Sequence, residues 1–167
     1  YMEECFYKVA GIPSYIRKFL KCEWDYIYTL NYDDAIEGIL SDYEIIVPYR
    51  KLNEKWLRSK KCLIKLHGDV HALLSTKEMK YCILSKKQYL ESIASPENKN
   101  LMEWLQDDYV SKDLLFIGCG LNNEYDFLFA DDNRKTAKLS YDASNLCLYL
   151  TVGQSRTVNF KILSLTI

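Results

Sequence analysis

Short apolar runs alternate with amphipathic stretches along most of the chain. The apolar runs are β-branched or aromatic and too short for helices, so they predict buried strands at residues 26–30, 62–66, 81–84 and 114–117. Apolar residues at helical spacing predict helices over residues 14–22, 34–40, 86–93 and 101–111. Two closing strands are expected at residues 146–150 and 158–165. This alternation is typical of an α/β fold whose mostly parallel sheet has helices on both faces.

Length and composition are those of one ordinary domain. The chain has 167 residues, 49% of them hydrophobic, which is enough for a single core, so one domain over 1–167 is expected. Its 22 basic and 23 acidic residues give a formal net charge of -1 without a block of one sign. A dedicated nucleic-acid binder usually has a basic excess, so no nucleic acid is expected. The sequence has neither a signal-peptide pattern nor the ~20 apolar residues that cross a bilayer, which predicts a cytoplasmic protein without a membrane partner.

The cysteine pattern does not predict a metal site. None of the 6 cysteines forms a CxxC motif or stands beside a histidine at metal-ligand spacing, so neither zinc nor another metal is expected. Cys62, Cys82, Cys119 and Cys147 lie in apolar runs or at their ends, where a free thiol behaves as a small hydrophobe. Reduced core cysteines of a cytosolic protein are therefore the preferred interpretation.

Unusual polar or glycine-rich groups follow three of the expected strands. They are Asn31-Tyr32-Asp33, His67-Gly68-Asp69 and Gly118-Cys119-Gly120. In a parallel sheet these strand ends share one edge, which is where open α/β folds bind ligands. Each group also has a purely structural interpretation: a helix cap, a packed histidine or a glycine turn. The glycines do not complete a GxGxxG motif, because Asn123 stands at the third glycine position, so a Rossmann dehydrogenase is a poor match.

Four strings together resemble the Sir2-like domain family. They are YIYTLNYDDAIE (26–37), LIKLHGDV (63–70), CILSKKQY (82–89) and LLFIGCGLNNEYD (114–126). Their order and spacing also fit the family, which has a Rossmann-like α/β fold. The chain most resembles the zinc-free bacterial branch, whose members hydrolyse NAD and often act in abortive defence against phages. Sirtuin protein deacylases are more distant relatives.

The resemblance implies a role for individual residues. Asn31 matches the catalytic asparagine that holds the nicotinamide ribose and positions water, and His67 matches the catalytic histidine. The resemblance thus implies that NAD is the substrate. Tyr32 and Asp33 are expected to face the nicotinamide amide, and Thr151 is expected to line the adenine site. The phosphates and the adenosine ribose are expected to be contacted by the loop of Gly118, Cys119, Gly120 and Leu121.

One feature of the family is missing from this sequence. Relatives begin with a strand and a Gly-Ala-Gly-x-Ser loop that cradles the pyrophosphate, whereas the early glycine here, Gly11, follows no apolar strand. We therefore expect a domain that lacks its N-terminal strand and nucleotide-binding segment, with a divergent domain as the alternative. We expect such a domain to self-associate, or to act together with an added sensor or ATPase domain or with a partner chain.

Three functions follow in order of preference. NAD hydrolysis, with release of nicotinamide and ADP-ribose, comes first. A catalytically inactive binding or assembly module comes second. A protein deacylase comes last, because the zinc-binding cysteines of that class are missing.

Overall fold

The computed structural model describes residues 6–8, 11–53, 57–117, 147–152 and 158–162. The chain divides into two compact units, residues 1–100 and 101–167, and each is described by itself. The expectation of a single domain stays a prediction. Among the described residues, no helix is long and apolar enough to cross a membrane.

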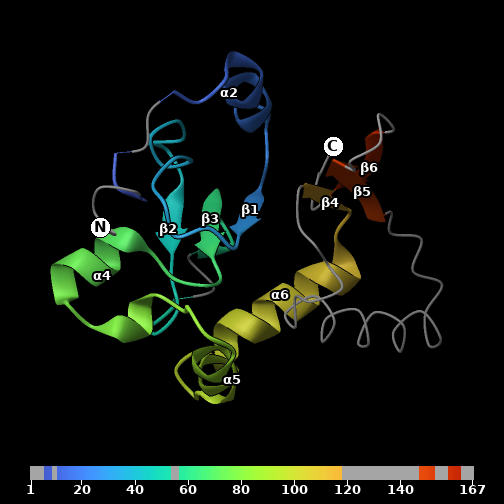
Figure 1. Cartoon of the computed structure of the whole chain (residues 1–167). Coiled ribbons are helices and arrows are strands. Elements are labelled where there is room, and N and C mark those ends of the chain that lie inside the picture. Colours follow the sequence, from blue (N-terminus) through green and yellow to red (C-terminus); the bar gives the residue numbers. More distant parts are fainter. Residues whose placement is uncertain (1–5, 9–10, 54–56, 118–146, 153–157, 163–167) are drawn as a thin grey trace. The chain divides into compact units, whose positions relative to one another are not determined.

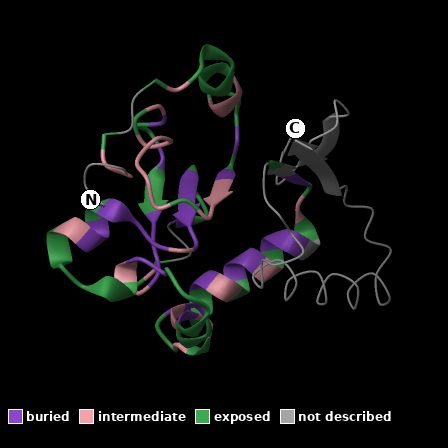
Figure 2. Cartoon of the chain, in the orientation of Figure 1, coloured by how far each residue is buried: buried purple, intermediate pink, exposed green. Residues whose placement is uncertain are grey.

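A parallel sheet forms the centre of the first unit. Its strands are β1 (Tyr26–Thr29), β2 (Glu44–Ile46) and β3 (Cys62–Lys65), in the spatial order β1-β3-β2 with both pairs parallel (Figure 1). Every residue of β3 is buried, which Figure 2 shows in purple, whereas Glu44 and Ile45 of β2 are exposed. The continuous apolar run at residues 62–64 therefore forms the central strand, as expected for a strand covered on both sides.

Short helices surround this sheet. They are α2 (Ser14–Leu20), α4 (Val70–Thr76), the 3₁₀ turn η1 (Met79–Tyr81) and α5 (Lys86–Ala94). The Asp69 side chain caps α4 by accepting a hydrogen bond from the Ala72 amide, and Ser85 caps α5 by accepting one from the Gln88 amide. Both caps satisfy amides that have no partner within the first helical turn, so they fix where these helices begin.

The second unit contains α6 (Lys99–Ser111) and a separate three-stranded sheet. Its strands are β4 (Leu114–Ile117), β5 (Cys147–Val152) and β6 (Val158–Ile162), in the order β4-β5-β6. β4 runs parallel to β5, and β6 is antiparallel to it. Leu101, Leu105 and Tyr109 of α6 are buried together with Trp104, which is the stripe that their spacing predicts.

The fold class is confirmed: the structure is α/β with mostly parallel strands. The expected strands that begin at residues 26, 62 and 114 are present, as are the helices that begin at 14 and 86. β2 and α4 were not predicted.

Two expected elements are wrong. Residues 34–40 form a turn instead of an α-helix, with α-type bonds only from Gly38 N to Asp34 O and from Leu40 N to Ile36 O. Seven residues that include a glycine do not sustain a helix, because nucleation is costly and glycine is a poor helix former. Residues 81–84 do not form a strand: Cys82 makes only an isolated antiparallel bridge with Gly68.

Candidate functional site

The ends of β1 and β3 bring two segments of the predicted site to one edge of the sheet. Thr29 lies opposite Lys65 in the parallel pair, and the Leu66 amide donates to the Thr29 carbonyl at 3.0 Å. Asn31 and His67 each follow these paired residues by two positions. Because neighbouring strands are about 4.8 Å apart, the two loops leave the sheet side by side.

Asn31 follows the end of β1 by two residues and lies at the surface. Its amide donates a hydrogen bond to Thr29 Oγ1 at 3.1 Å, a local bond that turns the chain out of the sheet. The residue is exposed. Its neutral side-chain amide is therefore accessible from solvent at the carboxyl end of the strand.

Tyr32 and Asp33 continue this loop and are both half-buried. Asp33 Oδ1 accepts a hydrogen bond from the Ala35 amide at 3.0 Å, which makes an Asx turn. The structural interpretation of Asp33 is thus correct in part: it stabilises the bend that follows, although that bend is a turn and not the expected helix. Its expected contact with nicotinamide stays a prediction.

Residues 6–8 pack on the same loop. The Asp34 amide donates to the Phe6 carbonyl at 3.2 Å, and Asp34 Oδ2 accepts from the Lys8 amide at 2.6 Å. The rings of Phe6 and Tyr32 meet edge to face at 5.9 Å between centroids. His71 Nε2 lies 3.5 Å from Asp34 Oδ2. These contacts order the outer side of the loop.

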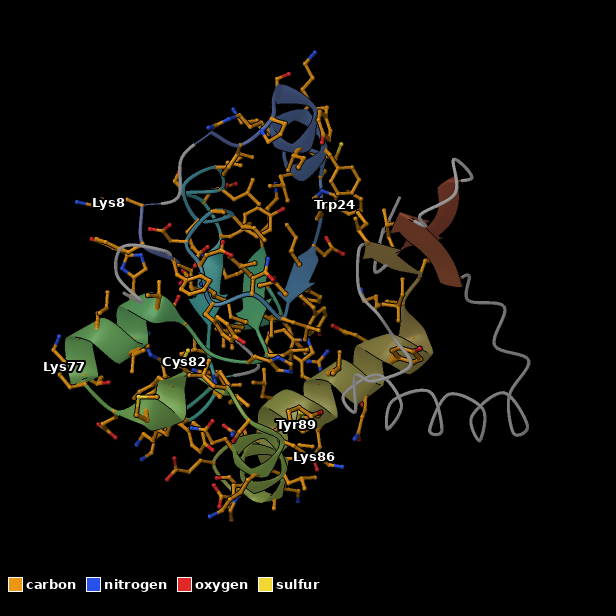
Figure 3. The ribbon with its side chains drawn as sticks, viewed as in Figure 1. Lys8, Trp24, Lys77, Cys82, Lys86 and Tyr89 are labelled. Carbon is orange, nitrogen blue, oxygen red and sulfur yellow. The ribbon has the colours of Figure 1, made fainter. Side chains whose placement is uncertain are left out.

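His67 is half-buried and held from two directions. Its carbonyl accepts a hydrogen bond from the Ile83 amide at 2.8 Å. Its imidazole meets the ring of Tyr89 edge to face, with 5.5 Å between centroids. Tyr89 belongs to α5, and Cys82 lies in the segment that leads from α4 to this helix (Figure 3). The imidazole therefore packs against α5, and the backbone of His67 follows the strand that pairs with β1.

Gly68 lets the chain pass close to the segment before α5. Its φ is +103°, and a Cβ built on it would lie 2.0 Å from the Tyr81 carbonyl oxygen. The neighbouring Asp69 amide donates to that same oxygen at 2.8 Å. Only glycine fits both the backbone angle and this close approach, so Gly68 fixes the path of the loop next to His67.

A buried lysine ties the two loops together. Lys65, the last residue of β3, is fully buried, and its Nζ donates to the carbonyl oxygens of Tyr32 at 3.1 Å and Asp33 at 2.6 Å. The same Nζ forms ion pairs with Glu37 Oε1 at 2.6 Å and Asp69 Oδ2 at 2.7 Å. We call Lys65, Glu37 and Asp69 the buried charge cluster.

The buried charge cluster has two carboxyl groups and one cation. Burial raises the pKa of the Glu37 carboxyl above its ordinary value of 4.5, while the hydrogen bond and the charge of Lys65 oppose that shift. Glu37 Oε2 is buried and has no hydrogen-bond partner among the described residues. Burial thus makes the Glu37 carboxyl hold a proton more readily than an exposed glutamate does.

Comparison with protein families decides the identity of the chain. The model of the SIR2-like domain matches residues 25–151. The chain belongs to the SIR2-like domain family. No curated protein and no solved structure matches it. SIR2-like domains bind NAD, and their family includes NAD-dependent enzymes.

The matched part of the SIR2-like domain includes every residue predicted for the site. Residues 118–121, with the expected phosphate loop, lie outside the described residues. Thr151 was expected after a late strand, but β5 continues through Val152 and pairs Thr151 with Asn159, so that strand end is corrected. Its place at the adenine stays a prediction.

The SIR2-like domain also contains site residues that sequence reasoning missed. No role was predicted for Lys65, Glu37 or Asp69. One signal was available: Lys65 interrupts an otherwise apolar strand, and a lysine buried in such a strand requires acidic partners. Within the described ranges, no group of three or more metal-binding side chains comes together.

Proposed function

We propose that this SIR2-like domain hydrolyses NAD to nicotinamide and ADP-ribose, with Asn31 and His67 as its catalytic pair. The parallel pairing of β1 with β3 carries the proposal, because it puts the loops of both residues at one sheet edge. Ligands of open α/β folds bind at the carboxyl ends of the strands. Family membership supplies the ligand, since SIR2-like domains bind NAD.

The residue types suit this chemistry. Hydrolysis breaks the bond between nicotinamide and the anomeric carbon and forms a bond from that carbon to water oxygen, through a transition state with oxocarbenium character. Nicotinamide leaves as a neutral molecule, so no strong acid is required. The Asn31 amide orients water and ribose hydroxyls without ionising. The His67 imidazole accepts the proton that the attacking water loses.

The biological setting that we propose is bacterial defence against phages, where NAD loss in the cytoplasm stops growth of the infected cell. It is tested by expressing the whole protein in bacteria, adding phage and measuring cellular NAD. A fall in NAD that requires both the phage and His67 supports this setting. Unchanged NAD with normal phage growth would contradict it.

Nicotinamide release from NAD by the purified whole protein tests the activity itself. General-base assistance is typically worth about 10² to 10⁴ in rate, so His67→Ala should lose at least about 10²-fold. His71→Ala is the control for loss of an imidazole that contacts the same loop: His71 is the other histidine of the chain, its side chain is half exposed, and no catalytic role is proposed for it, so its rate loss measures disturbance of the loop alone. Equal rates for wild type and His67→Ala would overturn the proposal.

One observation favours a second candidate, a module that binds or assembles without catalysis. Asp33 Oδ1 is engaged with the Ala35 amide, which is a structural use of a residue predicted to face the nicotinamide. Calorimetry with NAD separates the candidates. Binding or self-association without nicotinamide release supports the module, whereas release that depends on His67 rules it out. An acetylated peptide added with NAD tests for deacylation in the same assay.

A further inference from the structure

The buried charge cluster makes contacts that a purely structural ion pair does not need. Besides its two carboxylate partners, Lys65 Nζ donates to two consecutive carbonyl oxygens, at 3.1 Å to Tyr32 and 2.6 Å to Asp33. Those carbonyls belong to the loop after β1, whereas Lys65 ends the neighbouring strand. The lysine thus crosses from the central strand to the carbonyl groups of the two residues that follow Asn31.

We propose that Lys65 is a positioning residue that holds Asn31 in its reactive orientation. The catalytic part of this statement rests on the proposed NAD hydrolysis, whereas its structural part does not. Lys65 touches neither the substrate nor the reacting atoms in this proposal; it acts on the backbone that carries the asparagine.

The loop is restrained on both sides of Asn31. Before it, the Asn31 amide is bonded to Thr29 Oγ1 at 3.1 Å. After it, the Tyr32 carbonyl accepts from Lys65 Nζ and also from the Val70 amide, the latter at 2.9 Å. These bonds fix the peptide group before Asn31 and the peptide group that joins Tyr32 to Asp33, so the chain is held one residue to either side of the exposed Asn31 side chain.

The electrostatics argue that stability alone does not account for the cluster. A buried ion pair is often no more stable than apolar residues of the same volume, because both charges lose their hydration. Here a further carboxyl is buried as well, and its Oε2 has no hydrogen-bond partner within the described part of the chain. A role in ordering the loop explains why the central strand contains a charged lysine, although burying that charge costs its hydration.

The test compares variants of the whole protein that differ in charge and in stability. Lys65→Met alone leaves Glu37 and Asp69 buried without their cation and is prone to unfold. The working variant is therefore Lys65→Met/Glu37→Gln, which removes the cation and one carboxylate together and so keeps the formal charge of the cluster, while Asp69 Oδ1 still accepts from the Ala72 amide and caps α4. Ile64→Ala is the matched control, since Ile64 is the fully buried neighbour of Lys65 on β3, and its truncation lowers stability without touching the loop carbonyls.

Two measurements are made on each variant. Hydrogen exchange of the backbone over residues 30–36, relative to residues 62–64, reports loop order without any substrate. The kcat and KM of nicotinamide release report positioning. The double variant should exchange faster over 30–36 and lose about 10²-fold in kcat with a smaller change in KM, because displacement of a reacting group costs about that much. Ile64→Ala should retain both the loop protection and kcat.

The outcomes separate this inference from the proposed function. If the wild-type protein releases nicotinamide and the double variant keeps both its kcat and its loop protection, Lys65 has no positioning role although the activity stands. If the wild type releases no nicotinamide, the proposed function fails together with the catalytic part of the inference. Hydrogen exchange then still decides the structural part: faster exchange over 30–36 supports it, and unchanged exchange overturns it.

Discussion

Replacing Gly68 with alanine should damage both stability and the site. The backbone there has a φ of +103°, a region that costs a residue with a Cβ about 1–3 kcal/mol. The new Cβ would also lie 2.0 Å from the Tyr81 carbonyl oxygen, which is a backbone atom and cannot rotate away. The loop at residues 67–69 must therefore separate from residues 81–83.

That separation has a cost of its own. It stretches two backbone hydrogen bonds of 2.8 Å, from the Asp69 amide to the Tyr81 carbonyl and from the Ile83 amide to the His67 carbonyl. Each is worth about 1 kcal/mol net, and more when a buried group is left without a partner. Together with the backbone strain, Gly68→Ala should lower the free energy of unfolding by about 3–5 kcal/mol. It should also reduce nicotinamide release, because His67 moves with the loop.

Two other glycines provide controls for this prediction. Gly38→Ala should be neutral or slightly stabilising, since its new Cβ would make ordinary contacts of 3.5 and 3.7 Å and its φ is not positive. Gly11→Ala should cost only the backbone strain, because its φ is +77° and nothing lies within 4 Å. Urea unfolding at an unchanged m-value measures all three. If Gly68→Ala costs no more than Gly11→Ala, the steric argument is refuted.

Three further predictions follow from the buried groups. Because the raised pKa makes the folded protein hold the Glu37 proton more tightly than the unfolded chain, the contribution of Glu37 to stability should fall as pH rises above 4.5. Glu37→Gln should remove that slope in urea titrations, and an unchanged slope would refute the assignment. Asp69→Ala removes both the cap of α4 and a partner of Lys65, so it should lower the free energy of unfolding by at least about 3 kcal/mol in the same assay. Asp69→Asn keeps a capping oxygen and should lower it by less. Burial raises the pKa of the Cys82 thiol, whereas Cys22 is exposed. Peptide mapping after brief alkylation should therefore find Cys22 modified before Cys82, and the reverse order would be inconsistent with this burial.

Periodicity predicted the elements whose apolar residues are numerous and evenly spaced. The run at residues 62–66 contains enough apolar residues to identify a central strand, and the stripe of Leu101, Leu105 and Tyr109 identifies α6. The adjacency of the Asn31 and His67 segments could also be anticipated, because it requires only that β1 and β3 be parallel neighbours. The catalytic roles proposed for them came from family resemblance and not from any pattern.

The elements that the sequence did not predict depend on tertiary contacts. β2 is only Glu44–Ile46, with two exposed residues, and its strand conformation comes from pairing with β3. Cys82 lies in a continuous apolar run like that of a buried strand, yet its partner is the single residue Gly68, whose backbone angle no propensity reveals. The buried charge cluster joins residues 37, 65 and 69, so neither loop alone identifies it.

The buried charge cluster also predicts how this protein would respond to selection for heat resistance. Simultaneous apolar replacements of Lys65 and both of its acidic partners are the kind of change that raises melting temperature, since they remove the cost of dehydrating charges and leave no charge of the cluster unpaired. The same replacements release the carbonyls of residues 32 and 33 from their donor. Thermostable variants recovered at these positions should therefore be the ones with the poorest turnover, and the trade-off should be absent at Leu63 on the same strand.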